Sequence, residues 1–193
     1  MLILHLLAYR SRVANSLALL TGLLLAFAGC ASLPAYTLSP LPLDAVELSF
    51  ETLSLAQHGW GSKGVPNKPT IGVIASTADV DQWQTQVASS ILLLLKSVDY
   101  SRNIVMLVNR GESQCLPSEP SEILQIVRQG RRIQVFANFP EYPLFGWSRP
   151  CPAVLVYPHH IVVAPKREMW QDTFTFDLMV GPRVATTAEQ WIP

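Results

Sequence analysis

The segment EILQIVRQGRRIQVFANF, residues 122–139, decides the fold class. Apolar and polar residues alternate on both sides of Gln129-Gly130, and such alternation is typical of strands that bury one face. A glycine-containing link between two alternating runs is a β-hairpin signature. The sequence therefore predicts at least one antiparallel pair of strands in the second half of the chain.

Further strand-like runs lie on both sides of this hairpin. They are VELSFETLSL (46–55), TIGVIAS (70–76), NIVMLVN (103–109), AVLVYPHHIVVAPK (153–166) and TFTFDLMV (173–180). In the first of them, alternation should place Val46, Leu48 and Phe50 on one buried face. Gly- and Pro-rich connections separate these runs, as expected of strands joined by loops.

The segment STADVDQWQTQVASSILLLLKSVDY, residues 76–100, has a helical period instead. Its apolar residues recur at spacings of three and four, which predicts one amphipathic helix face. That face consists of Val80, Trp83, Val87, Ile91, Leu94 and Val98. Ser76 and Asp79 supply a capping start. One covering helix among about seven strands predicts an α+β fold with a mostly antiparallel β-sheet; a closed sandwich is the alternative.

The N-terminal sequence predicts export and attachment to a membrane. Arg10 and Arg12 precede the uncharged apolar run VANSLALLTGLLLAFAG, which ends at Cys30. A basic start, an apolar middle and small residues before a cleavage point describe a secretory signal peptide. The tripeptide before Cys30 resembles the bacterial lipobox, with Phe27 where Leu is usual. Cys30 is then the lipidation site, and an uncleaved signal-anchor helix is the alternative.

The chain divides into three parts on this interpretation. Residues 1–29 form the lipoprotein signal peptide and residues 30–45 form a lipid-anchored, proline-rich tether. Prolines at this density favour an extended, semi-rigid spacer. Residues 46–193 form the folded domain. Both readings of the N-terminus place that domain outside the cytoplasm, anchored to the bacterial cell membrane.

Composition and motifs argue against two classes of function. Lys and Arg balance Asp and Glu, and no clustered basic surface is evident, so we expect no nucleic-acid partner. The chain has no Gly-x-Ser-x-Gly elbow, no phosphate-binding glycine loop and no Cys-x-x-Cys or His-x-x-x-His spacing. We therefore expect no enzyme, no cofactor and no metal.

His159 and His160 are the residues that most invite a metal or catalytic interpretation. Successive side chains of a strand point to opposite faces, so the two rings cannot both reach one ion unless Pro158 introduces a bulge. Packing or hydrogen bonding in the strand is the favoured role, with one ring facing solvent. A metal site and acid/base chemistry are the alternatives.

Two cysteines remain after lipidation of Cys30. Cys115 and Cys151 form an even pair in an oxidising compartment, which indicates a disulfide, and two unpaired thiols are the alternative. Each lies beside prolines in a loop.

About 70 residues of the chain resemble the C-terminal domain of PrcB-type lipoproteins, secreted subunits that stabilise a partner protease. The resemblance rests on Asp99-Tyr100, on Gly111 and on the strand from Pro158 to Lys166. The family usually continues after Gly111 with Gly-Tyr, where this chain has ESQCLPSEPSE. The resemblance implies a protein-binding subunit of a protease complex.

The loop FPEYPLFGWSRPCP, residues 139–152, is the predicted partner-binding segment. It concentrates Tyr142, Leu144, Phe145 and Trp147 between prolines. Rigid aromatic side chains in loops are typical anchors of protein interfaces, although the same rings can instead cover the end of the sheet. The expected function is a non-catalytic protein-binding envelope lipoprotein. The alternative is a small-molecule or metal-binding lipoprotein.

Overall fold

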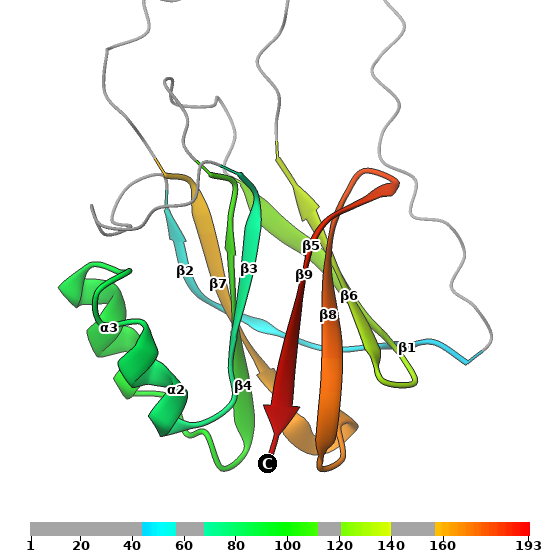
Figure 1. The fold of residues 1–193 in the computed structure, drawn as a ribbon, viewed down its shortest axis with the longest axis horizontal. Helices are drawn as coiled ribbons and strands as arrows, with labels where there is room; N and C mark the ends of the chain where they lie inside the picture. Colours follow the sequence, from blue (N-terminus) through cyan, green and yellow to red (C-terminus); the bar gives the residue numbers. More distant parts are fainter. Residues whose placement is uncertain (1–43, 57–67, 112–120, 140–156) are drawn as a thin grey trace, which may run out of the picture. The chain divides into compact units, whose positions relative to one another are not determined.

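A computed structural model describes residues 44–56, 68–111, 121–139 and 157–193 (Figure 1). All of them belong to the second of two compact units, Leu41–Pro193. The predicted signal peptide and nearly all of the tether lie outside the described residues. Within the described ranges, no helix has both the length and the apolar character needed to cross a membrane.

The described residues form an α+β fold that is mostly β, with mostly antiparallel strands, so the predicted fold class is confirmed. The strands form two sheets rather than one. The five-stranded sheet contains, in spatial order, β1 (Val46–Glu47), β5 (Glu122–Gln129), β6 (Arg132–Asn138), β8 (Asp172–Val180) and β9 (Arg183–Ile192). The four-stranded sheet contains β2 (Glu51–Ala56), β7 (His159–Pro165), β4 (Asn103–Asn109) and β3 (Thr70–Ile74). Only the β6–β8 pair is parallel among these neighbours.

The predicted hairpin at residues 122–139 is confirmed. β5 and β6 pair antiparallel, and Gln129 faces Arg132 across a two-residue turn. Gly130 has a φ of 59°, while no described non-glycine residue has a positive φ. This combination matches a type II′ turn, in which glycine takes the first central position and the twist suits the two strands.

The segment 46–55 is not one strand, as its alternation predicted, but two. β1 pairs with β5 in one sheet, and β2 pairs with β7 in the other. The chain crosses between the sheets at residues 48–50, where the Leu48 N–H donates to the Ile126 carbonyl at 2.8 Å. Leu48 is buried between the sheets. The crossing therefore closes one side of the space between them.

The main apolar core lies between the two sheets, so the sandwich packing weighed as an alternative is also present. Inward-facing residues of both sheets alternate with outward-facing ones, as the pleat of a strand requires. The largest fully buried members of this core are Phe174, Phe176, Leu48, Ile104, Met106, Ile126, Ile133 and Leu178. Their removal from water is the main force that holds the two sheets together.

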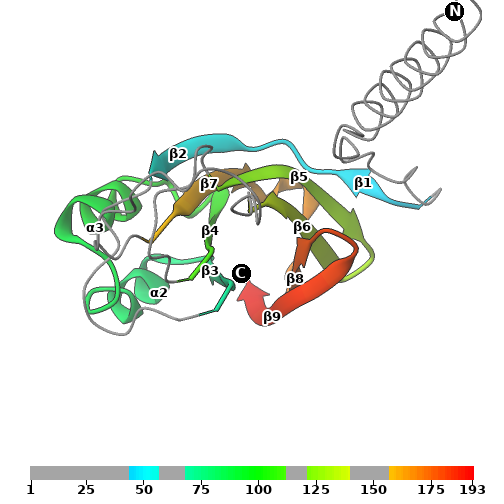
Figure 2. The same ribbon diagram turned by 90° about the horizontal axis from the view of Figure 1, so that it is seen from above.

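A second core lies between the four-stranded sheet and two helices, α2 (Thr77–Gln82) and α3 (Ser89–Lys96). Figure 2 shows both helices on the face of this sheet that points away from the five-stranded sheet. The prediction of one continuous helix over residues 76–100 is therefore wrong in the middle of that segment. The first helix ends at Gln82 and a second begins at Ser89. The buried residues of α3 are Ile91 and Leu95, whereas Leu94, predicted on the apolar face, is partly exposed.

Trp83 explains where the helical segment breaks. Its indole lies directly on Gly72 of β3, so that a Cβ added at Gly72 would stand 2.2 Å from the ring. The close approach holds residue 83 against the sheet and ends α2 there. At the other end, Ser76 and Asp79 form the predicted capping box, with both reciprocal hydrogen bonds present.

Lys166 is the first residue of the short 3-10 helix η1 (Lys166–Glu168). Its side chain connects the end of β7 to the backbone that follows β3 and to the backbone that precedes β4. Its ammonium donates to the carbonyls of Ala75 and Tyr100, each at 2.8 Å. The Tyr100 hydroxyl donates in turn to the Leu95 carbonyl, and burial raises the pKa of Tyr100 to about 12. Lys166 and Tyr100, two residues of the family resemblance, therefore have structural roles.

Candidate protein-binding surface

Most of the predicted site residues lie outside the described residues. These are the partner-binding candidates Tyr142, Leu144, Phe145 and Trp147, the lipidation candidate Cys30, and the disulfide candidates Cys115 and Cys151. The described strands nevertheless show where their segments begin and end. β4 ends at Asn109, which faces His159 at the start of β7.

The adjacent histidines lie at this same end of β7, on opposite faces of the strand as predicted. His160 faces the five-stranded sheet and His159 faces the helix side. Both are buried, with 3% and 1% of their surface exposed, so the expectation that one ring faces solvent is wrong. The five-stranded sheet packs on the face of β7 that carries His160 and the helices pack on the opposite face, so this inner strand has no solvent face.

His160 connects the two sheets through its ring. The Ile123 N–H of β5 donates to Nδ1 at 2.7 Å, and Nε2 lies 2.9 Å from the Thr52 hydroxyl of β2. Because Nδ1 accepts a hydrogen bond, the ring is neutral with its proton on Nε2, which donates to Thr52. Burial, followed by the proximity of His159, lowers the pKa of His160 to about 4. At neutral pH the uncharged ring of β7 therefore joins β5 of one sheet to β2 of the other, and we call this pair of hydrogen bonds the clasp.

His159 occupies the other face. Its Nδ1 lies 3.2 Å from the Tyr157 carbonyl, and burial lowers its pKa although this hydrogen bond opposes the shift. In the part of the chain that the structure describes, no group of three or more His, Cys, Asp or Glu side chains is placed to hold a metal ion.

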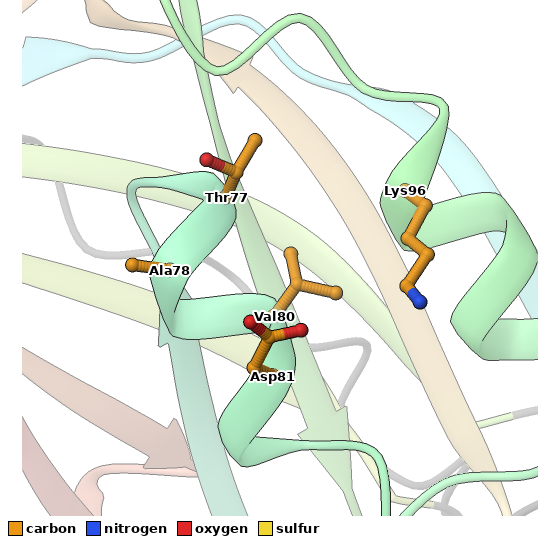
Figure 3. Close-up of a pocket in the computed structure, with 5 residues that line it drawn as sticks. All are labelled: Thr77, Ala78, Val80, Asp81 and Lys96. Atoms are coloured by element: carbon orange, nitrogen blue, oxygen red, sulfur yellow. The ribbon is translucent and has the colours of Figure 1, made fainter.

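A shallow pocket of about 320 Å³ lies between the two helices (Figure 3). It is lined by Thr77, Ala78, Val80 and Asp81 of α2 and by Lys96 of α3. Asp81 and Lys96 are both exposed to solvent, and Asp81 accepts a hydrogen bond from Gln84 at 2.7 Å. Water can solvate both charges, so this pocket does not present the convergent, desolvated polar groups of a small-molecule site.

The outward face of the five-stranded sheet carries an apolar row across four strands. The register places Gln125 of β5 beside Phe136 of β6, Phe136 beside Met179 of β8, and Met179 beside Val184 of β9. Leu124 lies in an irregularity of β5 at the end of this row. We call Leu124, Phe136, Met179 and Val184 the apolar row.

The two ends of the apolar row are the exposed parts. Val184 is 48% exposed and Leu124 is 40% exposed, whereas Met179 is buried by its neighbours and Phe136 is half-buried. Two aliphatic side chains are therefore exposed on the solvent face of one sheet, with partly or fully buried apolar residues between them, and an apolar strip of this kind favours association with another apolar surface. The arrangement can bind a protein without any chemical step.

A polar network borders the apolar row on the same face. Asp177 of β8 is fully buried, its carboxylate paired with Arg132 and accepting a hydrogen bond from Thr187 at 2.7 Å. The Arg132 interaction helps to lower the pKa of Asp177 against the opposing effect of burial. Further along this face Trp191 is 53% exposed. An apolar strip with a satisfied polar border is the usual composition of a protein interface.

The sequence interpretation missed this surface because it missed β9. The preceding strand ends at Val180, and Gly181-Pro182 then forms a two-residue turn into Arg183, with Gly181 at a φ of 61°. Glycine followed by another residue between two strands is a type II′ hairpin signal. Recognition of this turn would have predicted β9 and with it the exposed position of Val184.

Comparisons with models of protein families, with curated proteins and with solved structures found no match for this chain.

Proposed function

We propose that this protein is an envelope lipoprotein, anchored to the bacterial cell membrane through Cys30, whose folded domain is a non-catalytic protein-binding module. The observation that carries the binding function is the apolar row, with Leu124 and Val184 exposed at its ends. The signal sequence before Cys30 supports the location, and the PrcB-like residues support an extracytoplasmic protease complex as the partner.

Capture of the partner tests the binding function. The full chain, tagged and extracted from membranes with detergent, is compared with a Leu124→Lys/Val184→Lys variant. We expect the variant to lose at least about 10-fold in affinity for the protein that co-purifies with the wild type, because charged side chains replace apolar contacts at a desolvated interface. Direct binding of the purified partner gives the affinity.

Thr173→Lys is the matched control for each single substitution, Leu124→Lys or Val184→Lys, since it adds the same single charge at an exposed position of β8 on the same face, outside the apolar row. The binding function of the apolar row is disproved if this control and the row variant bind equally well. A Phe145→Ser/Trp147→Ser variant tests the predicted loop separately. Loss of thermal stability without loss of binding would rule out the loop as an interface.

Lipidation is tested independently of the partner. Mass spectrometry of the mature wild-type chain should show cleavage before Cys30 and a mass added at that residue. Cys30→Ser should abolish both. Persistence of residues 1–29 in the wild-type protein would instead favour the uncleaved signal-anchor helix.

A further inference from the structure

The contact between His160 and Ile123 lies at the point where the four-stranded sheet meets the apolar row. Ile123 belongs to β5 and His160 to β7, so this hydrogen bond joins the two sheets directly. Leu124, the next residue after Ile123, lies in the irregularity of β5 and forms the exposed end of the row. The position of the ring is therefore coupled to the position of Leu124.

The irregularity of β5 depends on an acceptor outside its own ladder. Ile123 faces Ala137 and Gln125 faces Phe136, so that two steps on β5 match one step on β6. In such a bulge the strand pairing is locally disrupted and a backbone group must find another partner. The Ile123 N–H finds it in Nδ1 of His160, at a site where a buried N–H without an acceptor would cost about 1–3 kcal/mol.

Protonation of His160 removes this acceptor. Both ring nitrogens of an imidazolium are donors, so the new Nδ1–H would point at the Ile123 N–H. Two donors cannot share a hydrogen bond, and the Thr52 hydroxyl serves only Nε2. The charged ring would also lie in an apolar site beside Phe50, whose ring centroid is 6.5 Å away. The charged ring therefore fits only if β5 and β7 separate.

The charged groups around the ring do not offset this effect. The titratable or charged side chains on the strands that pack against it are Glu51 of β2, Glu122 and Arg128 of β5, and His159 of β7 itself. β4, which places Val108 opposite His160, has none. Of these groups, only His159 acts on the titration of His160, and a second positive charge opposes protonation.

We infer that His160 is a proton-sensitive clasp: in its neutral form it holds the β5 irregularity and presents Leu124, and its protonation separates β5 from β7 and displaces that end of the apolar row. Acid should thus weaken partner binding before the domain unfolds. The effect on binding rests on the proposed function, but the opening of the contact does not.

The opening is measured on the full chain in detergent micelles between pH 7 and pH 3.5. Nitrogen-15 NMR of labelled histidine should find the proton of His160 on Nε2 at pH 7. Hydrogen–deuterium exchange, corrected for the pH dependence of intrinsic exchange, should show protection of residues 122–126 falling at least about 10-fold as His160 titrates. Protection of Phe174, Phe176 and Leu178 in β8 should persist at the same pH.

His160→Asn is the decisive variant, because its Oδ1 can replace Nδ1 as acceptor and does not titrate. The acid-induced loss of protection at residues 122–126 should disappear in His160→Asn and remain in the control His159→Asn. A proton on Nδ1 of the wild-type ring, equal acid sensitivity in His160→Asn, or simultaneous loss of protection in β8 would each overturn the clasp. The NMR result needs no variant, so misfolding of His160→Asn leaves the inference testable.

Partner binding is measured last, at pH 7 and at the pH where protection is lost. Weaker binding in acid for the wild type, but not for His160→Asn, supports control of the apolar row by the clasp. Equal weakening in both overturns that control. A wild type that binds no partner at pH 7, while residues 122–126 still open in acid, refutes the proposed function and leaves the clasp intact.

Discussion

At the scale of single residues, some polar side chains make long-range hydrogen bonds that the periodicity of a strand or helix does not reveal. His160 and Lys166 both stand in an apolar stretch of sequence, and both use their polar atoms on backbone groups of other elements. The sequence predicted the two faces of the histidine pair correctly from the pleat alone. It did not predict that both faces are covered, because the covering elements are distant in the chain.

Gly72 supports a prediction about packing. Gly72→Ala should lower the free energy of unfolding by about 1–3 kcal/mol, because the added methyl group would overlap the Trp83 indole. Urea denaturation measures the change. In a Trp83→Phe background, which lacks the overlapping ring atoms, the same substitution should cost less than half as much. An equal cost in both backgrounds would show that the two residues do not interact.

The buried histidines predict how stability depends on pH. His160 has a pKa of about 4 in the folded protein against an ordinary value of 6.5, so between these values only the unfolded chain binds the proton. Stability is therefore complete above pH 6.5 and falls as the pH decreases toward 4, by on the order of 2–3 kcal/mol. His159, whose pKa is also lowered, adds to the same trend.

Denaturation curves at pH 7 and pH 4.5 measure this trend. His160→Asn should retain only part of the decrease, because His159, whose pKa is also lowered, still titrates. Asp177 cannot cause the decrease in this range, since its folded pKa is lowered below an ordinary value of 3.8 and its contribution is lost only in stronger acid. A wild type that is equally stable at both pH values would contradict the prediction.

At the scale of elements, local sequence patterns predicted well whether a segment is a strand or a helix, and predicted poorly where each element begins and ends. The β5–β6 hairpin could be predicted because its turn residues and its alternation agree. The division of 46–55 into β1 and β2 could not, because alternation continues unchanged through the crossing at residues 48–50. The break at Trp83 depends on Gly72, a residue on another element, so the helical period alone could not reveal it.

β9 supports a prediction about register. Ala188 faces the core and lies opposite Phe176, whereas its neighbour Glu189 faces outward. Ala188→Asp should destabilise the fold by about 2–4 kcal/mol, because it places a carboxylate between the sheets. Glu189→Ala should change stability by less than about 0.5 kcal/mol. Thermal denaturation distinguishes the two, and the reverse order would mean that β9 pairs one residue out of register.

At the scale of the whole molecule, the two sheets are joined on opposite sides by different means. On one side the chain itself crosses from β1 to β2, and on the other β3 and β9 approach each other. The Gln190 amide near the end of β9 donates to Asp79 at the start of α2 at 3.2 Å. The candidate surface could not be predicted from any single segment of the sequence, since the residues of the apolar row lie on four strands.

The ends of β4 and β7 bear on the predicted disulfide. Asn109 and His159 face each other, so the segments that contain Cys115 and Cys151 leave the four-stranded sheet at one place. We predict that a thiol assay of the denatured full chain detects these two cysteines only after reduction. Cys115→Ser/Cys151→Ser should lower stability by about 3–4 kcal/mol if chain entropy dominates. Two reactive thiols before reduction would disprove the bridge.

The crossing at residues 48–50 also determines how the domain responds to tension. A pull on the chain before Val46 loads the two-residue pairing of β1 with β5 and the hydrogen bond from Gln129 to Asp44 first. It reaches β2 and the four-stranded sheet only after Leu48 has left the core. The molecule should therefore lengthen by on the order of 20 Å at low force before either sheet breaks, which would absorb small movements of the membrane anchor that we propose at Cys30.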